Sequence, residues 1–199
     1  MRAVTAAVGS RGIDALTLVN TPAVAAGLKK SGVDFVGQYL GRVTPASVAC
    51  LLEAGLAFTP ITYADIFDPN DGLDVLKLLG APSGCTVWLD VESVTTLTVA
   101  ELQQKINAWA SALAGAGYQP GVYVGCLSLL TSAELYALKV VRYWKSQSCV
   151  RDRFNNLVEP TCGWCMYQLY PSVSWAGVWS DVNFVQQDHK GRLPVLVQA

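Results

Sequence analysis

The segment Thr86-Val87-Trp88-Leu89-Asp90-Val91-Glu92 predicts a buried β-strand that ends in two carboxyl groups. Its β-branched and aromatic residues form an apolar run, which suits a strand covered on both faces. Side chains two positions apart on a strand point to the same face, so Asp90 and Glu92 should share one surface. Neighbouring carboxylates repel, which separates their pKa values and lets one keep a proton near neutral pH. Such a pair could cleave a glycosidic bond, or could simply cap a strand end in solvent.

Length and composition favour one globular domain. The chain has 199 residues, of which 52% are apolar and 15% are charged, so it can bury a substantial core. The formal net charge is -1 and lysines and arginines do not cluster, which argues against a nucleic-acid surface or an anionic membrane surface. No apolar run approaches the length of a membrane span. Residues 1–8 are too short for a secretory apolar region and are expected to lead into the first strand.

Strand and helix patterns alternate along the chain. Short β-branched or aromatic runs predict eight strands, at residues 12–16, 35–40, 57–63, 86–91, 121–124, 140–144, 165–169 and 178–184. Helices between them should begin at Thr21-Pro22, at Thr44-Pro45 and at the capping box formed by Thr98 and Glu101. Such alternation implies parallel strands joined by right-handed crossovers.

Eight such strands predict a small (β/α)₈ barrel of the TIM type, which covers residues 1–199 as a single domain. Its last helices are expected to be degenerate, because residues 151–161 are polar and residues 170–177 are too short for a crossover helix. A doubly wound sheet is the alternative. No glycine-rich phosphate loop follows the first strand, however, and the barrel is therefore favoured.

Acidic, aromatic and amide side chains recur at the predicted strand ends, where barrel enzymes place their active sites. The acids are Asp14, Asp90, Glu92 and Asp181, and the other side chains are Tyr39, Tyr63, Tyr123, Trp144, Gln168 and Asn183. Barrel closure makes the first and eighth strands neighbours, so Asp14 and Asp181 should lie together and face the other two acids. Carboxylates ringed by aromatic side chains suit a sugar. Each tyrosine could be an ordinary strand residue. Such separate structural roles do not explain, however, why four acids all fall at the ends of predicted strands.

The cysteines and the histidine form no clear metal or cofactor motif. Cys162-Gly163-Trp164-Cys165 has redox or zinc-ligand spacing, but a second ligand pair is missing and the single histidine, His189, is expected at the surface. A packed thiol pair is favoured, or a disulfide that could involve Cys149. The remaining cysteines, Cys50, Cys85 and Cys126, are expected in apolar surroundings. Residues 65–71 have some likeness to a calcium loop without its closing glutamate, so a solvated loop is favoured and no metal or cofactor is expected.

Three short motifs carry a family resemblance. Gly12-Ile13-Asp14, Asp90-Val91-Glu92 and Asp181-Val182-Asn183 resemble motifs of the lysozymes of glycoside hydrolase family 25, and Tyr167-Gln168-Leu169-Tyr170 is similar to that family's aromatic-Gln-Tyr segment. Residues 36–41 and 55–61 look closer still to related bacterial and phage glycoside-hydrolase-like domains of unknown function. The resemblance spans nearly the whole chain in order. It departs at Thr62-Tyr63-Ala64-Asp65, where the lysozymes carry a Tyr-His-Phe-like run.

The resemblance implies a barrel that hydrolyses the β-1,4 bond between N-acetylmuramic acid and N-acetylglucosamine in peptidoglycan. Glu92 would be the general acid. Asp90 would stabilise the positive charge at the anomeric carbon or orient the substrate's acetamido group. Asp14 and Asp181 would tune Glu92 and hold the sugar, with Asn183 as their partner.

The expected partner is thus peptidoglycan or a related polysaccharide, met by a monomer without a cofactor. Such a protein, made in the cytoplasm, would act on the cell wall after lysis or delivery, as a phage endolysin or an effector. The alternatives are a hydrolase of another polysaccharide, a non-catalytic glycan-binding module, and a phage-particle protein in which the barrel is a scaffold.

Overall fold

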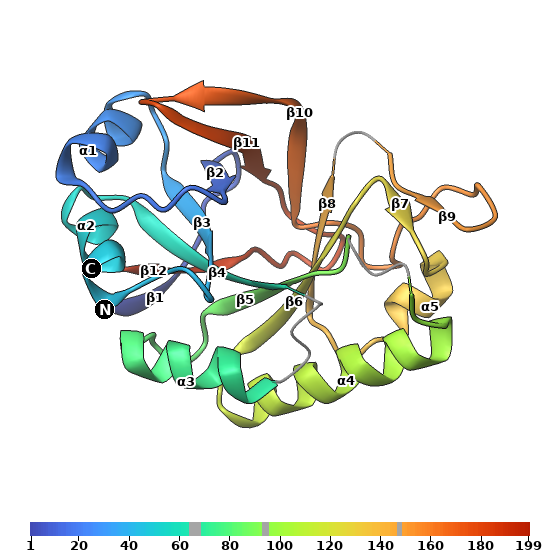
Figure 1. The fold of residues 1–199 in the computed structure, drawn as a ribbon. Coiled ribbons are helices and arrows are strands. Elements are labelled where there is room, and N and C mark those ends of the chain that lie inside the picture. Colours follow the sequence, from blue (N-terminus) through green and yellow to red (C-terminus); the bar gives the residue numbers. More distant parts are fainter. Residues whose placement is uncertain (64–68, 93–95, 147–148) are drawn as a thin grey trace.

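The computed structural model describes residues 1–63, 69–92, 96–146 and 149–199, and within them it shows a closed eight-stranded barrel (Figure 1). The barrel strands, in order around the wall, are β2 (Arg11–Ala15), β3 (Phe35–Tyr39), β4 (Ala57–Tyr63), β5 (Thr86–Asp90), β6 (Gln119–Val124), β8 (Arg142–Ser146), β10 (Met166–Trp175) and β11 (Val178–Val185). The barrel closes where β11 pairs with β2. These strands correspond to the eight predicted runs, and their ends differ from the prediction by at most two residues, except that β10 continues six residues beyond its predicted end at Leu169.

The last strand runs against the others, which corrects the prediction of an all-parallel barrel. β11 is antiparallel to both β10 and β2. It follows β10 through a tight hairpin in which Trp175 pairs with Val178. The two turn residues, Ala176 and Gly177, have φ angles of 48° and 81°. Positive φ at both central positions matches the twist of two antiparallel strands, so this turn reverses the chain without a crossover helix.

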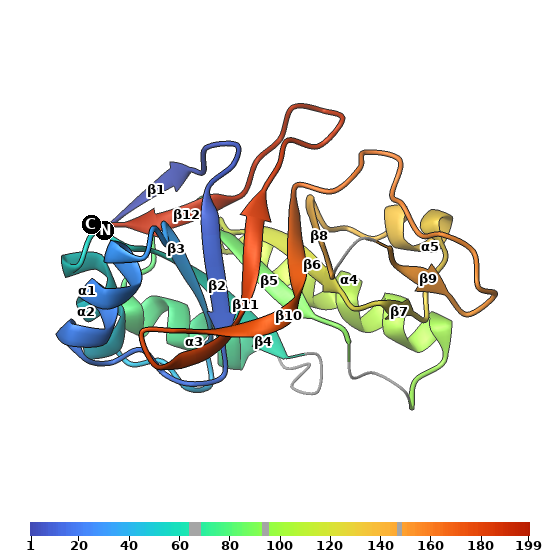
Figure 2. The ribbon, with the colours of Figure 1, turned by 90° about the horizontal axis from the view of Figure 1, so that it is seen from above.

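Helices accompany only the first part of the barrel. They are α1 (Pro22–Lys30), α2 (Pro45–Glu53), α3 (Pro69–Leu79), α4 (Val99–Gly115) and the short α5 (Ser132–Tyr136). In Figure 2, α1 and α2 lie at the left and α4 extends to the right, and β10 and β11 are joined by a hairpin without a helix between them. The protein is therefore a mixed α/β chain built on a closed barrel, and the (β/α)₈ TIM-type prediction is wrong. Among the described residues, no helix is long and apolar enough to cross a membrane.

The predicted helix starts are confirmed. The Thr21 hydroxyl accepts a hydrogen bond from the Val24 N–H, and Thr44 and Thr98 each form a capping box. Pro22 and Pro45 occupy the first helical turn, where a missing N–H costs nothing. The side chains of these caps satisfy N–H groups that the helix itself leaves unpaired, which is why a local pattern was enough to predict them.

Within the described ranges, four shorter strands lie outside the barrel wall, and none of them was predicted. They are β1 (Arg2–Thr5), β7 (Leu127–Ser128), β9 (Arg151–Asp152) and β12 (Val195–Gln198). β1 and β12 form an antiparallel pair that brings the two termini together, and Val197 of β12 pairs with Phe58 of β4 (Figure 1). β7 and β9 form a small separate sheet beside α5. Residues 1–8 thus hold a strand of their own before the first barrel strand.

Large side chains fill the barrel interior, and glycines on neighbouring strands make room for them. Phe35, Trp88 and Trp144 belong to this interior cluster and are almost fully buried. A Cβ added at Gly121 would lie 2.6 Å from the Trp88 ring, and one added at Gly12 would overlap the Phe35 ring. Small and large residues therefore alternate across the interior, as a narrow barrel requires.

We expect Gly12→Ala to destabilise the protein by about 1–3 kcal/mol, because the new methyl group forces the buried Phe35 ring out of its position. Urea unfolding followed by circular dichroism measures this change. Gly41→Ala is the matched control, since a Cβ there meets no atom within 4 Å. Equal unfolding free energies for the two variants would contradict the packing argument.

All six cysteines are free. Cys162 belongs to the larger hydrophobic cluster, and Cys165 belongs to the cluster inside the barrel. Both thiols are free, so the predicted alternative of a disulfide is not found. Cys126 and Cys149 are exposed, which corrects the expectation of apolar surroundings for Cys126. The His189 side chain is 66% exposed, as predicted. The calcium-like stretch lies largely outside the described residues.

Candidate functional site

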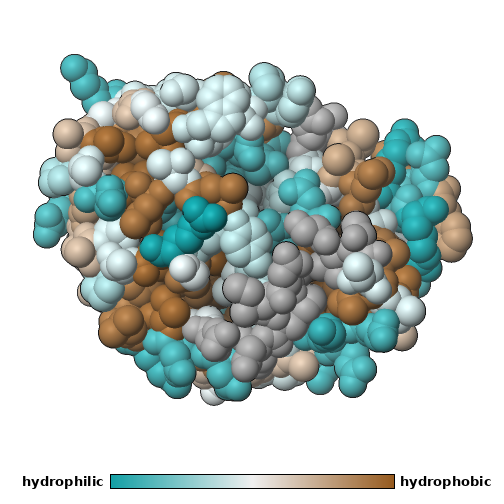
Figure 3. Space-filling view, viewed as in Figure 1, coloured by the Kyte–Doolittle hydropathy of each residue, from teal (hydrophilic) through white to brown (hydrophobic). Residues whose placement is uncertain are grey.

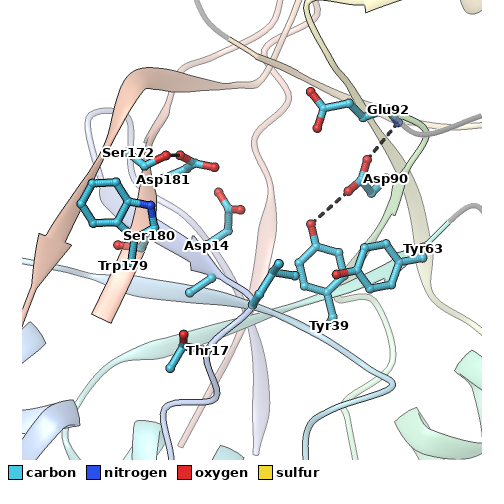
Figure 4. A pocket seen from close by; sticks show the side chains of 12 residues that line it. Asp14, Thr17, Tyr39, Tyr63, Asp90, Glu92, Ser172, Trp179, Ser180 and Asp181 are labelled. Carbon is cyan, nitrogen blue, oxygen red and sulfur yellow. Dashed lines mark hydrogen bonds between the residues drawn. The ribbon is translucent and has the colours of Figure 1, made fainter. Parts of the chain in front are cut away.

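The carboxyl ends of the parallel strands surround a cavity of about 540 Å³. Its lining contains all four predicted acids together with aromatic and hydroxyl side chains: Asp14, Ala15, Leu16, Thr17, Tyr39, Tyr63, Asp90, Glu92, Ser172, Trp179, Ser180 and Asp181. Figure 4 shows Asp14 between Asp181 on one side and the Asp90–Glu92 pair on the other. The space-filling view of Figure 3 shows hydrophilic, intermediate and apolar residues mixed over the face of the molecule seen in Figure 1.

Strand direction explains why the acids meet. Asp14 lies near the end of β2, and Asp90 is the last residue of β5. Asp181 lies in the first half of β11, but this strand is antiparallel, so its beginning lies at the same end of the barrel. Register then places Asp181 directly opposite Asp14. The predicted proximity of these two acids is therefore confirmed, although it arises from an antiparallel pair.

A hydrogen-bonded network holds Asp14. The Asn183 side-chain amide donates to Asp14 Oδ2 at 2.6 Å, and Gln168 Nε2 donates to the same oxygen at 3.1 Å and to Asp181 Oδ2 at 3.3 Å. The Tyr123 hydroxyl donates to Gln168 Oε1 at 2.7 Å, which fixes the amide orientation. Burial raises the pKa of Asp14 to about 7, and the nearby charge of Asp181 adds to this effect against the opposing hydrogen bonds.

Asp90 is held differently. The Tyr39 hydroxyl donates to Asp90 Oδ2 at 3.0 Å, and the Glu92 backbone N–H donates to Asp90 Oδ1 at 3.0 Å (Figure 4). Two donors, one on each oxygen, stabilise the ionised carboxylate and fix its direction. Burial and the negative charge of Asp90 raise the pKa of the Tyr39 phenol, so Tyr39 stays a proton donor in this bond.

Glu92 lies just beyond the strand, because β5 ends at Asp90 and the chain then turns. The prediction that Glu92 shares a strand face with Asp90 is therefore corrected, because the strand ends before Glu92. Its carboxyl group can still meet solvent in the cavity, but partial burial raises its pKa, and the charges of Asp90 and Asp181 raise it further. Gly125 lies against the Glu92 side chain, since an added Cβ would be 2.6 Å from Glu92 Cγ. The missing side chain at Gly125 therefore leaves the space that Glu92 occupies.

Two of the predicted aromatic side chains line the cavity and two do not. Tyr39 and Tyr63 stack with ring centroids 4.0 Å apart and form part of the wall. Tyr123 and Trp144 are 4% and 2% exposed and pack against each other inside the barrel, below the cavity. Their predicted contact with substrate is therefore corrected to a supporting role, and in the case of Tyr123 this role is to orient Gln168.

Asn183 is likewise buried, with 1% exposure, and it holds Asp14 rather than lining a cavity. Gln168, in contrast, reaches a second cavity of about 220 Å³ beside the first. This smaller cavity is lined by Glu92, Cys126, Ser146, Gln168, Leu169, Tyr170, Ser172 and Asp181. The two cavities thus share three residues and meet at Glu92 and Asp181.

Sequence reasoning missed Ser172 and Trp179, both on the β10–β11 arm. The Ser172 hydroxyl donates to Asp181 Oδ1, and the Trp179 ring lies beside them (Figure 4). Trp179 precedes Asp181 by two positions on β11, so the period-two rule would have placed both on one face. Ser172 carried no such signal, because it depends on the fold of the arm. In the described part of the chain, no group of three His, Cys, Asp or Glu side chains is arranged to hold a metal ion.

Comparison with known proteins identifies the class of fold. No family model and no curated protein matches this chain. A crystal structure of an uncharacterized protein from B. stearothermophilus is similar, with a TM-score of 0.67 and 18% sequence identity over 89% of this chain and 96% of the other. At this identity the similarity concerns the fold alone. The protein is thus an α/β chain with a closed barrel, and four carboxyl groups line the cavity at one end of this barrel.

Proposed function

We propose that this protein is a glycoside hydrolase that cleaves the β-1,4 bond between N-acetylmuramic acid and N-acetylglucosamine in peptidoglycan. The observation that carries the proposal is the convergence of four carboxyl groups on one cavity walled by stacked tyrosines. Glycosidic bonds are cleaved by paired carboxyl groups in different protonation states. The choice of peptidoglycan comes from the motif resemblance. In this role the protein would act as a phage endolysin or as an effector delivered to the cell wall.

The different surroundings of Glu92 and Asp90 support separate roles. The raised pKa of Glu92 favours the protonated form that can donate to the glycosidic oxygen. Asp90 accepts one hydrogen bond on each carboxyl oxygen, which favours its charged form and suits stabilisation of a positively charged anomeric carbon or orientation of the acetamido group. The glycosidic C–O bond breaks with its electron pair on the oxygen that Glu92 protonates. Water then supplies hydroxide to the anomeric carbon, and its remaining proton restores Glu92.

Asp14 and Asp181 would act on the sugar from the opposite wall. Gln168 joins the two carboxyl groups through one amide nitrogen, so both keep a fixed position relative to the cavity. The Asp181 charge also raises the pKa of Glu92, which helps Glu92 to stay protonated. Tyr63 is half-buried and lines the cavity, so its ring can offer apolar surface to a pyranose ring, while the buried Tyr39 ring supports it by stacking.

Digestion of purified peptidoglycan followed by mass spectrometry of the products tests the proposal. We expect fragments with new N-acetylmuramic acid reducing ends. Saccharide binding without any product would instead identify a non-catalytic glycan-binding module. Cleavage of a different polysaccharide alone would keep the hydrolase assignment and change the substrate.

A glycine substitution tests the placement of the acid without removing it. We expect Gly125→Ala to lower the hydrolysis rate about 10–100-fold, because the new methyl group displaces the Glu92 carboxyl group. Stability should change little, since the mobile end of a glutamate can move aside. Gly115→Ala, at which a Cβ meets no atom within 4 Å, serves as the control. Full activity of Gly125→Ala would show that the position of Glu92 in this structure is not the active one.

A further inference from the structure

We propose that a glycan chain lies across both cavities in a defined direction. The sugar whose anomeric carbon reacts would occupy the larger cavity beside Trp179, and the leaving-group sugar would occupy the smaller cavity beside Tyr170. This inference rests on the proposed function and deepens it, because it assigns a binding site to each side of the cleaved bond.

The arrangement of the two cavities supports a continuous cleft. Both are open to solvent, and both include Glu92, Ser172 and Asp181 in their walls. Glu92 therefore stands where the larger space of about 540 Å³ meets the smaller space of about 220 Å³. A general acid must reach the oxygen that joins two sugars, so one sugar has to lie on each side of it.

The direction follows from the other acids. Asp14 and Asp90 line the larger cavity and are not part of the smaller one. Asp90 is the fixed carboxylate that would face the developing positive charge, and this charge forms on the sugar that keeps the anomeric carbon. That sugar must therefore lie in the larger cavity. The leaving sugar, which needs only the proton of Glu92, lies in the smaller one.

One exposed aromatic side chain stands at each cavity. Trp179 is 66% exposed and lines the larger cavity, and Tyr170 is 76% exposed and lines the smaller one. Both belong to the arm formed by β10 and β11, which also carries Ser172 and Asp181. A flat ring in each cavity can stack on a sugar face while the polar groups of the cleft bind hydroxyls.

Two substrates that share the sugar bearing the reacting anomeric carbon, but differ in the leaving group, distinguish the two proposed binding sites. One is a peptidoglycan oligosaccharide, and the other is the matching glycosyl fluoride, whose leaving group occupies no sugar site. We expect Trp179→Ala to lower kcat/KM about tenfold for both substrates. Tyr170→Ala should lower kcat/KM about tenfold for the oligosaccharide and by a much smaller factor for the fluoride. Phe154→Ala removes an aromatic side chain that is 64% exposed outside both cavities, and it should change neither value.

The outcomes distinguish this inference from the proposed function. If Tyr170→Ala lowers both values equally, or changes neither, the assigned direction is wrong while the hydrolase stands. If the unmodified protein cleaves neither substrate, the proposed function fails. Calorimetric titration with the oligosaccharide then still tests the cleft: weaker binding by both Trp179→Ala and Tyr170→Ala supports it, and unchanged Kd values overturn it.

Discussion

Glu92→Gln is expected to lower kcat on peptidoglycan about 10²–10⁴-fold, because glutamine cannot donate a proton to the leaving oxygen. The substitution keeps the size of the side chain and its position beside Gly125, so the melting temperature should stay close to that of the unmodified protein. Release of new reducing ends, measured at several pH values, gives the rate. Glu53→Gln, at an exposed position at the end of α2, is the matched control and should retain full activity.

The pH profile adds a second measure of the same residue. The general acid works only when protonated, so activity should fall as the pH rises through the pKa of Glu92, which is raised above the ordinary value of 4.5. The residual activity of Glu92→Gln should no longer fall as the pH rises through this range, which means that the alkaline limb of the pH profile is lost. A variant with unchanged kcat and the same alkaline limb would show that another group is the acid.

Asp14→Asn is expected to change how stability depends on pH. The pKa of Asp14 is about 7 in the folded protein and near 3.8 when the chain is unfolded. Between these values the folded protein holds a proton that the unfolded chain has lost. The stability from this proton is fully present below about pH 4, falls by about 1.4 kcal/mol per pH unit, and is gone above pH 7. The total is on the order of 4 kcal/mol.

The variant has no group that titrates at this position, so its free energy of unfolding should rise relative to the unmodified protein as pH increases from 4 to 7. Urea unfolding at four pH values measures the difference. Asp74→Asn, at an exposed position on α3, is the control and should run parallel to the unmodified protein. Parallel curves for Asp14→Asn as well would mean that Asp14 ionises in the folded state near its ordinary pKa.

The local elements and the acids of the site could be predicted from sequence because each depends on neighbours in the chain. The capping of Thr98 by Glu101 spans three residues, and the apolar run before Asp90 marks a buried strand without knowledge of its partners. Asp14 and Asp181 could be placed together by assuming barrel closure. The aromatic side chains were harder, because Tyr39 and Trp144 both end predicted strands and only packing decides which one meets the cavity.

The sequence by itself determined the number and approximate limits of the barrel strands, the starts of α1, α2 and α4, and the four acids, since these follow from residue type and spacing. Tertiary structure decided the rest. Two residues with positive φ, Ala176 and Gly177, reversed the last strand and replaced a crossover helix by a hairpin. That reversal placed Ser172 and Trp179 in the wall of the larger cavity. Contacts between distant strands then gave each acid its own environment, because burial and hydrogen bonding depend on the whole fold.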